Sequence, residues 1–123
     1  MEVVTLKLED LDVYNMALSI GEDVWKAVAP WSYFDKDTVG KQLIRSADSF
    51  AANIAEGYGR FHYKENRLFC YYSRGSMMET RTWLSKARAR NLISDKMYAE
   101  LSARLDNLHL KLNAYIKSIG SHS

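Results

Sequence analysis

Apolar side chains recur at intervals of three and four residues in four successive segments of the chain, which is the period of an α-helix. The segments cover residues 8–29, 37–58, 63–91 and 94–119. None of them alternates as a strand would. The last segment has the most regular stripe, which predicts a helix packed along one face. That stripe consists of Met97, Leu101, Leu105, Leu108, Leu112, Tyr115 and Ile119.

Residues that start and stop helices lie between these segments. Pro30 is predicted to end the first helix, and Asp35 or Asp37 to cap the second. Gly57-Tyr58-Gly59 offers a residue that tolerates a positive φ at the end of the second helix, and Ser94 caps the fourth. Because the three connections are short, consecutive helices are expected to be antiparallel neighbours. The pattern predicts an all-α fold, an antiparallel up-down-up-down four-helix bundle.

The first segment carries two adjacent apolar lines instead of one. The first line consists of Leu11, Tyr14, Leu18, Gly21, Trp25 and Val28. The second consists of Val13, Ala17, Ile20 and Val24. An apolar face this wide exceeds what one helix seam requires, so we expect burial on two sides, once inside the bundle and once against another molecule.

The second segment pairs an apolar line with a polar one. The apolar line, expected in the core, consists of Val39, Leu43, Ala47, Phe50 and Ile54. Beside it, Arg45, Asn53 and Glu56 face Ser76 and Glu79 of the third segment in the predicted bundle. We interpret these five residues as a buried structural network that sets helix register, since buried charges persist only when paired. The alternative is an active site built on Glu56 and Glu79.

The third segment has a periodic line with two small residues in the middle of the helix. The line consists of Phe69, Tyr72, Ser76, Glu79 and Trp83, with Leu68, Gly75 and Met78 alongside. Gly75 and Ser76 lower helix propensity, so they are predicted to permit close contact with another helix.

Candidate catalytic and metal-binding groups are few. Cys70 has only His62 nearby as a base and is interpreted as a small buried residue. Asp106 and His109 show the spacing of a di-iron ligand pair, but no second copy of that motif occurs. We therefore expect no enzyme, no metal or other cofactor, and no small-molecule substrate.

Length and composition indicate one globular domain over residues 1–123, with 47% hydrophobic and 26% charged residues. The first twelve residues hold four acids and one lysine, which is unlike a signal peptide. No stretch is long and apolar enough for a membrane span, and the single cysteine excludes an internal disulfide. A cytoplasmic location without membrane association is expected.

Charge is unevenly distributed although the net charge is only +2. Residues 1–37 carry eight acids against three lysines, a net of −5, whereas residues 60–90 carry eight basic residues against two acids, a net of +6. Such a basic helix can neutralise the phosphates of RNA or single-stranded DNA. The candidate phosphate contacts are Arg60, Lys64, Arg67, Arg74, Arg81, Lys86, Arg88 and Arg90. Alternatively, the basic residues complement the dipole at the C-terminus of their helix, or they pair with the acidic first helix, within the bundle or between subunits.

Several motifs of the second and third helices resemble one protein family. They are Gln42-Leu-Ile-Arg-Ser-Ala47, Ser49, Asn53-Ile-Ala-Glu-Gly57, Gly59-Arg60, Arg74-Gly-Ser76 and Glu79, with Leu11, Val13, Tyr14 and Ala17 in the first helix. They are similar to the four-helix-bundle proteins encoded in intervening sequences of bacterial 23S ribosomal RNA genes. Ser46 and Arg74 depart from the family pattern, which usually has alanine at both positions.

The resemblance implies an up-down bundle and a non-catalytic homo-oligomer, specifically a barrel-like pentamer. One related protein, the accessory variability determinant of diversity-generating retroelements, binds a reverse transcriptase and nucleic acid through a basic surface. By resemblance, the partners expected for this chain are other copies of itself and either RNA or a reverse transcriptase nucleoprotein. A protein–protein interaction module without nucleic-acid binding is the alternative.

Overall fold

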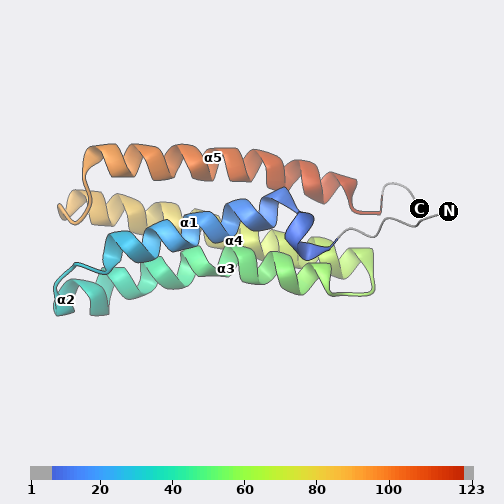
Figure 1. Cartoon of the computed structure of the whole chain (residues 1–123), viewed down its shortest axis with the longest axis horizontal. Helices are drawn as coiled ribbons and strands as arrows, with labels where there is room; N and C mark the ends of the chain where they lie inside the picture. Colours follow the sequence, from blue (N-terminus) through green and yellow to red (C-terminus); the bar gives the residue numbers. More distant parts are fainter. Residues whose placement is uncertain (1–6, 121–123) are drawn as a thin grey trace.

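The computed structural model describes residues 7–120, which form an all-helical domain with no strand in that range. Its four long helices are α1 (Asp12–Val28), α3 (Lys41–Tyr58), α4 (Tyr63–Ala89) and α5 (Asp95–Ser118). The short elements are η1 (Leu8–Asp10), α2 (Tyr33–Asp35) and the π-helical η2 (Lys36–Gly40). The long helices lie along the long axis of the molecule, and the chain turns back at each connection (Figure 1). The predicted all-α class with four long helices is confirmed.

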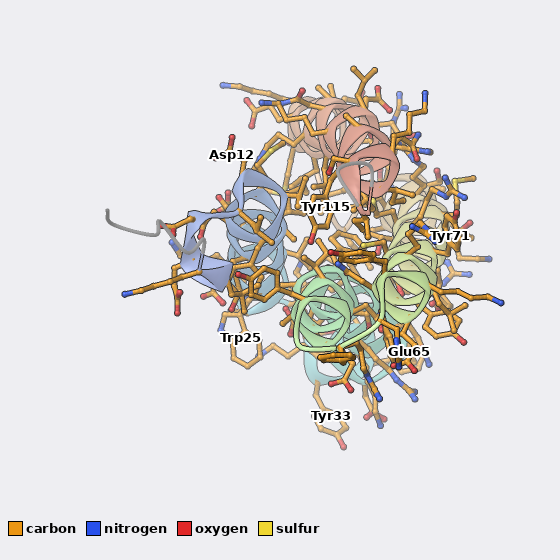
Figure 2. All side chains as sticks on the ribbon, turned by 90° about the vertical axis from the view of Figure 1, so that its right-hand side faces the viewer. Asp12, Trp25, Tyr33, Glu65, Tyr71 and Tyr115 are labelled. Atoms are coloured by element: carbon orange, nitrogen blue, oxygen red, sulfur yellow. The ribbon has the colours of Figure 1, made fainter. Side chains whose placement is uncertain are left out.

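The four long helices surround a single core. Helix α3 packs against both α1 and α4, and α5 packs against the same two helices from the other side. An end-on view shows this four-cornered arrangement, in which α1 and α4 occupy diagonal corners (Figure 2). The basic α4 therefore has α3 and α5 as its main neighbours in the bundle, and the acidic α1 lies across the core from it.

Most residues of the core lines predicted for the first, second and fourth segments are buried as expected. The five residues of the line that begins at Val39 in η2 and continues along α3 are at most 2% exposed, and so are Leu105, Leu108 and Leu112 of α5. In α1 the inner line of Val13, Ala17, Ile20 and Val24 is buried. These helices follow the hydrophobic periodicity because their inner positions hold the large aliphatic side chains.

The buried face of α4 differs from the periodic line noted in its sequence. The buried residues of this helix are Cys70, Ser73, Met77, Thr80, Leu84 and Ala87. Tyr72 and Glu79 are exposed instead, and Gly75 is exposed with open space where a Cβ would stand, so it does not mediate close helix packing. The inner face combines small and hydroxyl-bearing residues with Met77 and Leu84, whereas other large apolar residues lie outside. Hydrophobicity alone therefore does not distinguish the two faces of α4.

The start of the second long helix also differs from the prediction. Helix begins at Tyr33, and Ser32 is its cap: Ser32 Oγ accepts a hydrogen bond from Asp35 N at 3.2 Å and donates to Asp35 Oδ2 at 2.9 Å. Asp35 is thus the partner of the cap, and Asp37 lies inside the helical segment. By contrast, Ser94 caps α5 as predicted, with its Oγ accepting from Met97 N at 3.0 Å.

The C-terminal ends of α3 and α4 differ in backbone conformation. Gly59 follows α3 with a φ of −76°, so the expected positive φ is absent there. Gly57 is needed for close approach instead, because a Cβ would lie 2.8 Å from Asn66 Oδ1. Helix α4 ends with Asn91 at φ 60° and a bond from Leu92 N to Ala87 O of 2.8 Å, the Schellman arrangement.

Candidate interaction surfaces

Four of the predicted phosphate-binding arginines form a column along the edge of α4 that faces α5. They recur every seven residues, or about two helical turns, which keeps them on one flank of the helix. Their partners are the Ile119 carbonyl for Arg67 (2.9 Å), Asn113 Oδ1 for Arg74 (2.8 Å), Asp106 Oδ1 for Arg81 (2.7 Å) and Asp95 Oδ1 for Arg88 (2.9 Å). We call these four residues the arginine column. It joins α4 to α5, and the repeat of seven was the signal in the sequence that marked it.

The other four predicted phosphate contacts are placed differently. Arg60 pairs with Glu56, and its guanidinium carbon lies 4.8 Å from the centroid of the Phe69 ring. Lys64, Lys86 and Arg90 are exposed, and none of them takes part in an ion pair within residues 7–120. Within residues 7–120, these three of the eight basic side chains have neither an acidic partner nor a partner on the α5 side.

The predicted buried network of Arg45, Asn53, Glu56, Ser76 and Glu79 is not formed. Arg45, Glu56 and Glu79 are exposed, and the other two are half-buried. Asn53 Nδ2 donates to its own helix, to Ser49 O at 2.9 Å. The network fails because this polar line of α3 faces outward along the α3–α4 edge.

The two carboxylates of the alternative active site are also far apart. A hydrogen bond of 2.8 Å joins Thr80 Oγ1 to Ser46 Oγ, which places Glu79 level with the α3 residues around Ser46. Glu56 lies ten residues further along α3, or about 15 Å by helix rise. It is paired with Arg60, whereas Glu79 accepts from Trp83 Nε1 at 3.4 Å. The two side chains therefore do not form a catalytic carboxylate pair.

A different polar set, which the sequence did not reveal, holds α3 against α4. Ser46, Ser73 and Thr80 are the buried polar residues, and Ser73 Oγ donates to the Phe50 carbonyl at 3.0 Å. Every buried side-chain nitrogen or oxygen in the described part of the chain has a hydrogen-bond partner. Ser46, one of the two departures from the family pattern, gains the Thr80 hydroxyl as partner. Arg74, the other departure, gains Asn113.

The geometry gives Cys70 no role as a nucleophile. Its side chain is fully buried, and burial raises the pKa of the thiol to about 11. The thiol therefore stays protonated near neutral pH. Among the described residues, no group of three or more His, Cys, Asp and Glu side chains could hold a metal ion. No helix in the same part of the chain is long and apolar enough to cross a membrane.

Two apolar faces of the bundle are left uncovered. On α4, the outward side chains of Leu68, Tyr71 and Met78 are 43–55% exposed, and Gly75 lies among them. These four residues are the outer column of α4. On α1, the outer part of the wide apolar face is also exposed, including Leu18 and Trp25. Trp25 and Tyr71 lie on opposite sides of the bundle (Figure 2).

Arg104, which the sequence analysis did not single out, closes the seam between α1 and α5. Its guanidinium pairs with Asp23 and donates to Ser19 Oγ at 2.9 Å. On either side of this clasp the seam opens into shallow apolar hollows, lined on one side by Ala27, Met97 and Leu101. An acid of α1 is thus paired within the bundle with an arginine of α5.

Comparison with known proteins agrees with this architecture. A crystal structure of a protein of unknown function from the S23 ribosomal protein family of Bacteroides thetaiotaomicron superposes with a TM-score of 0.76. The two chains are 19% identical, and the match covers 86% of this chain and 99% of the other. No curated protein sequence matches significantly. A model of the 23S rRNA-intervening sequence protein family matches residues 9–114. The chain therefore belongs to the 23S rRNA-intervening sequence protein family.

Proposed function

We propose that this chain is a non-catalytic, homo-oligomeric scaffold that binds RNA or a nucleoprotein through a basic surface. In this proposal the subunit is an antiparallel up-down-up-down bundle in the cytoplasm, and the assembly is the pentamer that the family resemblance implies. The observation that carries it is a group of exposed cations on neighbouring α3 and α4 that form no ion pair within residues 7–120. We call Lys41, Arg45, Lys86 and Arg90 the basic patch.

The basic patch lies where the two helices adjoin near α2. The Ser46–Thr80 hydrogen bond sets the register, so the α3 residues 41–45 lie level with α4 residues from about Thr80 onward. All four cations are exposed, and no ion pair within residues 7–120 involves them. Lys86 Nζ lies 5.9 Å from the centroid of the half-buried Trp83 ring. Unpaired cations beside an aromatic ring suit a phosphate backbone with adjacent bases.

The arginine column is a poorer candidate for the same task. Each of its guanidinium groups already donates to an acceptor on the α5 side, which leaves fewer N–H groups and less free charge for a phosphate. Within residues 7–120 the patch cations take part in no ion pair. We therefore assign RNA contact to the patch and helix cohesion to the column.

The experiment measures mass by light scattering, alone and with a mixed structured RNA, at low and moderate salt. We expect an oligomer that gains RNA mass, with affinity falling steeply as salt rises because counterions are released from the RNA. The triple variant K41E/R45E/R90E should lose RNA affinity by at least tenfold and keep its oligomeric mass.

The matched control is the triple variant K96E/K111E/K117E on exposed α5 positions, which changes net charge by the same amount. An equal loss of RNA affinity in the two variants would show only a general charge effect and would contradict the patch. A wild-type oligomer that ignores RNA would instead favour the second candidate, a protein–protein interaction module. The observation that favours this candidate is the pair of exposed apolar faces on α1 and α4.

A further inference from the structure

A groove between α1 and α3 combines apolar lining residues with two acidic side chains. Tyr14 and Leu18 line it from α1, and Ala52 and Ala55 from α3, around a hollow of about 330 Å³. Its floor is made by small residues that include Gly21. Small side chains on both helices allow another helix to approach closely.

The acids Glu22 and Asp48 lie at the end of this groove that is nearest Gly21. Asp48 leans across to α1, since its Oδ1 lies 2.8 Å from where a Cβ of Gly21 would stand. Neither acid takes part in an ion pair within the described residues. Burial and the charge of Glu22 both raise the pKa of Asp48. A cation placed here would relieve the repulsion between the two carboxylates.

The outer column of α4 has the complementary features. Leu68 and Gly75 are seven residues apart, about 10 Å along the helix, which equals the length of the groove from Tyr14 to Gly21; Met78 lies about 5 Å beyond. Lys64 lies one turn before Leu68 and is exposed without an acidic partner in residues 7–120. An apolar ridge with a lysine at one end therefore matches an apolar groove with two acids at one end.

We propose that the groove between α1 and α3 binds the outer column of α4 from a second copy of this chain, with Lys64 of that copy beside Glu22 and Asp48. This inference rests on the proposed oligomeric scaffold and names the surfaces that build it. The match of charges sets the direction: the α4 of the second copy runs antiparallel to α1.

The two surfaces lie on different sides of one subunit, as the opposite positions of Trp25 and Tyr71 indicate (Figure 2). Each subunit therefore offers a groove to one neighbour and a column to another. Such head-to-tail contacts are heterologous, and they produce a closed ring when the rotation between subunits closes.

The test uses two blocked variants. A52W fills the groove from an exposed position, and G75W places a bulky side chain in the outer column where nothing lies within 4 Å of a Cβ. We expect each variant alone to be a monomer by light scattering, and their equimolar mixture to form a complex of two chains. In that complex the intact column of A52W occupies the intact groove of G75W, and no further subunit can add.

The control is L110W, on an exposed α5 position outside both surfaces, which should keep the wild-type mass. Circular dichroism and the thermal midpoint check that every variant is folded. An oligomeric wild type whose A52W or G75W variant keeps full mass, or whose mixed variants stay monomeric, would overturn this contact and leave the scaffold proposal standing. A monomeric wild type would overturn both.

A second measurement tests the direction of the contact. K64E and D48K should each raise the dissociation constant of the oligomer at least tenfold. The double variant K64E/D48K should recover most of the lost affinity, because the charge pair is restored with reversed sign. Failure of the double variant to recover would contradict the placement of Lys64 beside Asp48.

Discussion

Helix α4 carries two columns of side chains that differ in their contacts within the subunit. The arginine column has long, charged side chains, and every one of them reaches an acceptor on α5. The outer column has apolar side chains, and Leu68, Tyr71 and Met78 remain between 43% and 55% exposed. On this helix the charged column finds its acceptors inside the subunit, whereas the apolar column stays exposed to solvent.

This contrast shows that residue type alone does not tell which face of a helix lacks contacts within its own subunit. Arginine can cover an interhelical seam with its aliphatic stem while its guanidinium meets a polar group. An apolar side chain on an outward face has no such compensation in water. The exposed apolar column is therefore better evidence of a binding surface than the basic column.

The largest expected effect on the free energy of unfolding comes from replacing one of two adjacent methionines by alanine. Met77 is fully buried and Met78 is 55% exposed. M77A should lower the free energy of unfolding by about 2–5 kcal/mol, because it leaves a cavity in the core. M78A should change it by no more than about 0.5 kcal/mol in the free subunit. Urea unfolding measures both values.

These unfolding measurements need protein concentrations low enough to dissociate the proposed oligomer, because association would add apparent stability. At concentrations where the oligomer persists, M78A should reduce oligomeric mass and M77A should act mainly on unfolding. Equal losses of subunit stability in the two variants would mean that α4 is rotated from the position described.

The sequence was sufficient for the class of fold and for most of the core. Aliphatic side chains in α3 and α5 repeat every three or four residues, and those residues are buried. The cap at Ser94 was also predictable, since Ser is a strong N-cap. These features depend on local spacing, which is visible in one chain.

The orientation of α4 and the candidate sites could not be predicted in the same way. Ser73 and Thr80 face the core because Phe50 and Ser46 of α3 accept their hydrogen bonds, and such pairing depends on tertiary register. The exposure of Arg45 follows from the same register. The seven-residue repeat of the arginines is visible in the sequence, but their acceptors on the α5 side depend on tertiary packing.

The next largest effect is a pH dependence of the free energy of unfolding. It tests the burial of Cys70 on the inner face of α4, whose neighbour Tyr71 faces outward. The pKa of the buried thiol is raised to about 11 from an ordinary value of 9.0. Above pH 9 the unfolded chain releases this proton while the folded chain keeps it, so stability falls as pH rises from about 9 to 11. The loss should approach about 2 kcal/mol at pH 11.

The C70A variant should lack this part of the pH dependence. Burial raises the pKa of Tyr115 in both proteins, and the charge of the Cys70 thiolate raises it further in the wild type alone. The difference between the two unfolding curves therefore reports Cys70 together with its effect on Tyr115. Parallel curves for wild type and C70A between pH 9 and 11 would contradict a buried thiol.

The smallest effect sharpens the interpretation of the arginine column. Arg81 and Asp106 are joined at 2.7 Å, but their side chains are 28% and 71% exposed, so water screens the pair. A double-mutant cycle with R81Q and D106N should give a coupling of about 0.2–1 kcal/mol that weakens with added salt. The same cycle with R90Q in place of R81Q should give none, because Arg90 has no ion pair within residues 7–120. If R81Q also left RNA affinity unchanged while R90Q lowered it, the column would act in helix cohesion and the patch in recognition. A coupling above about 2 kcal/mol would mean instead that another subunit covers the pair and removes its water.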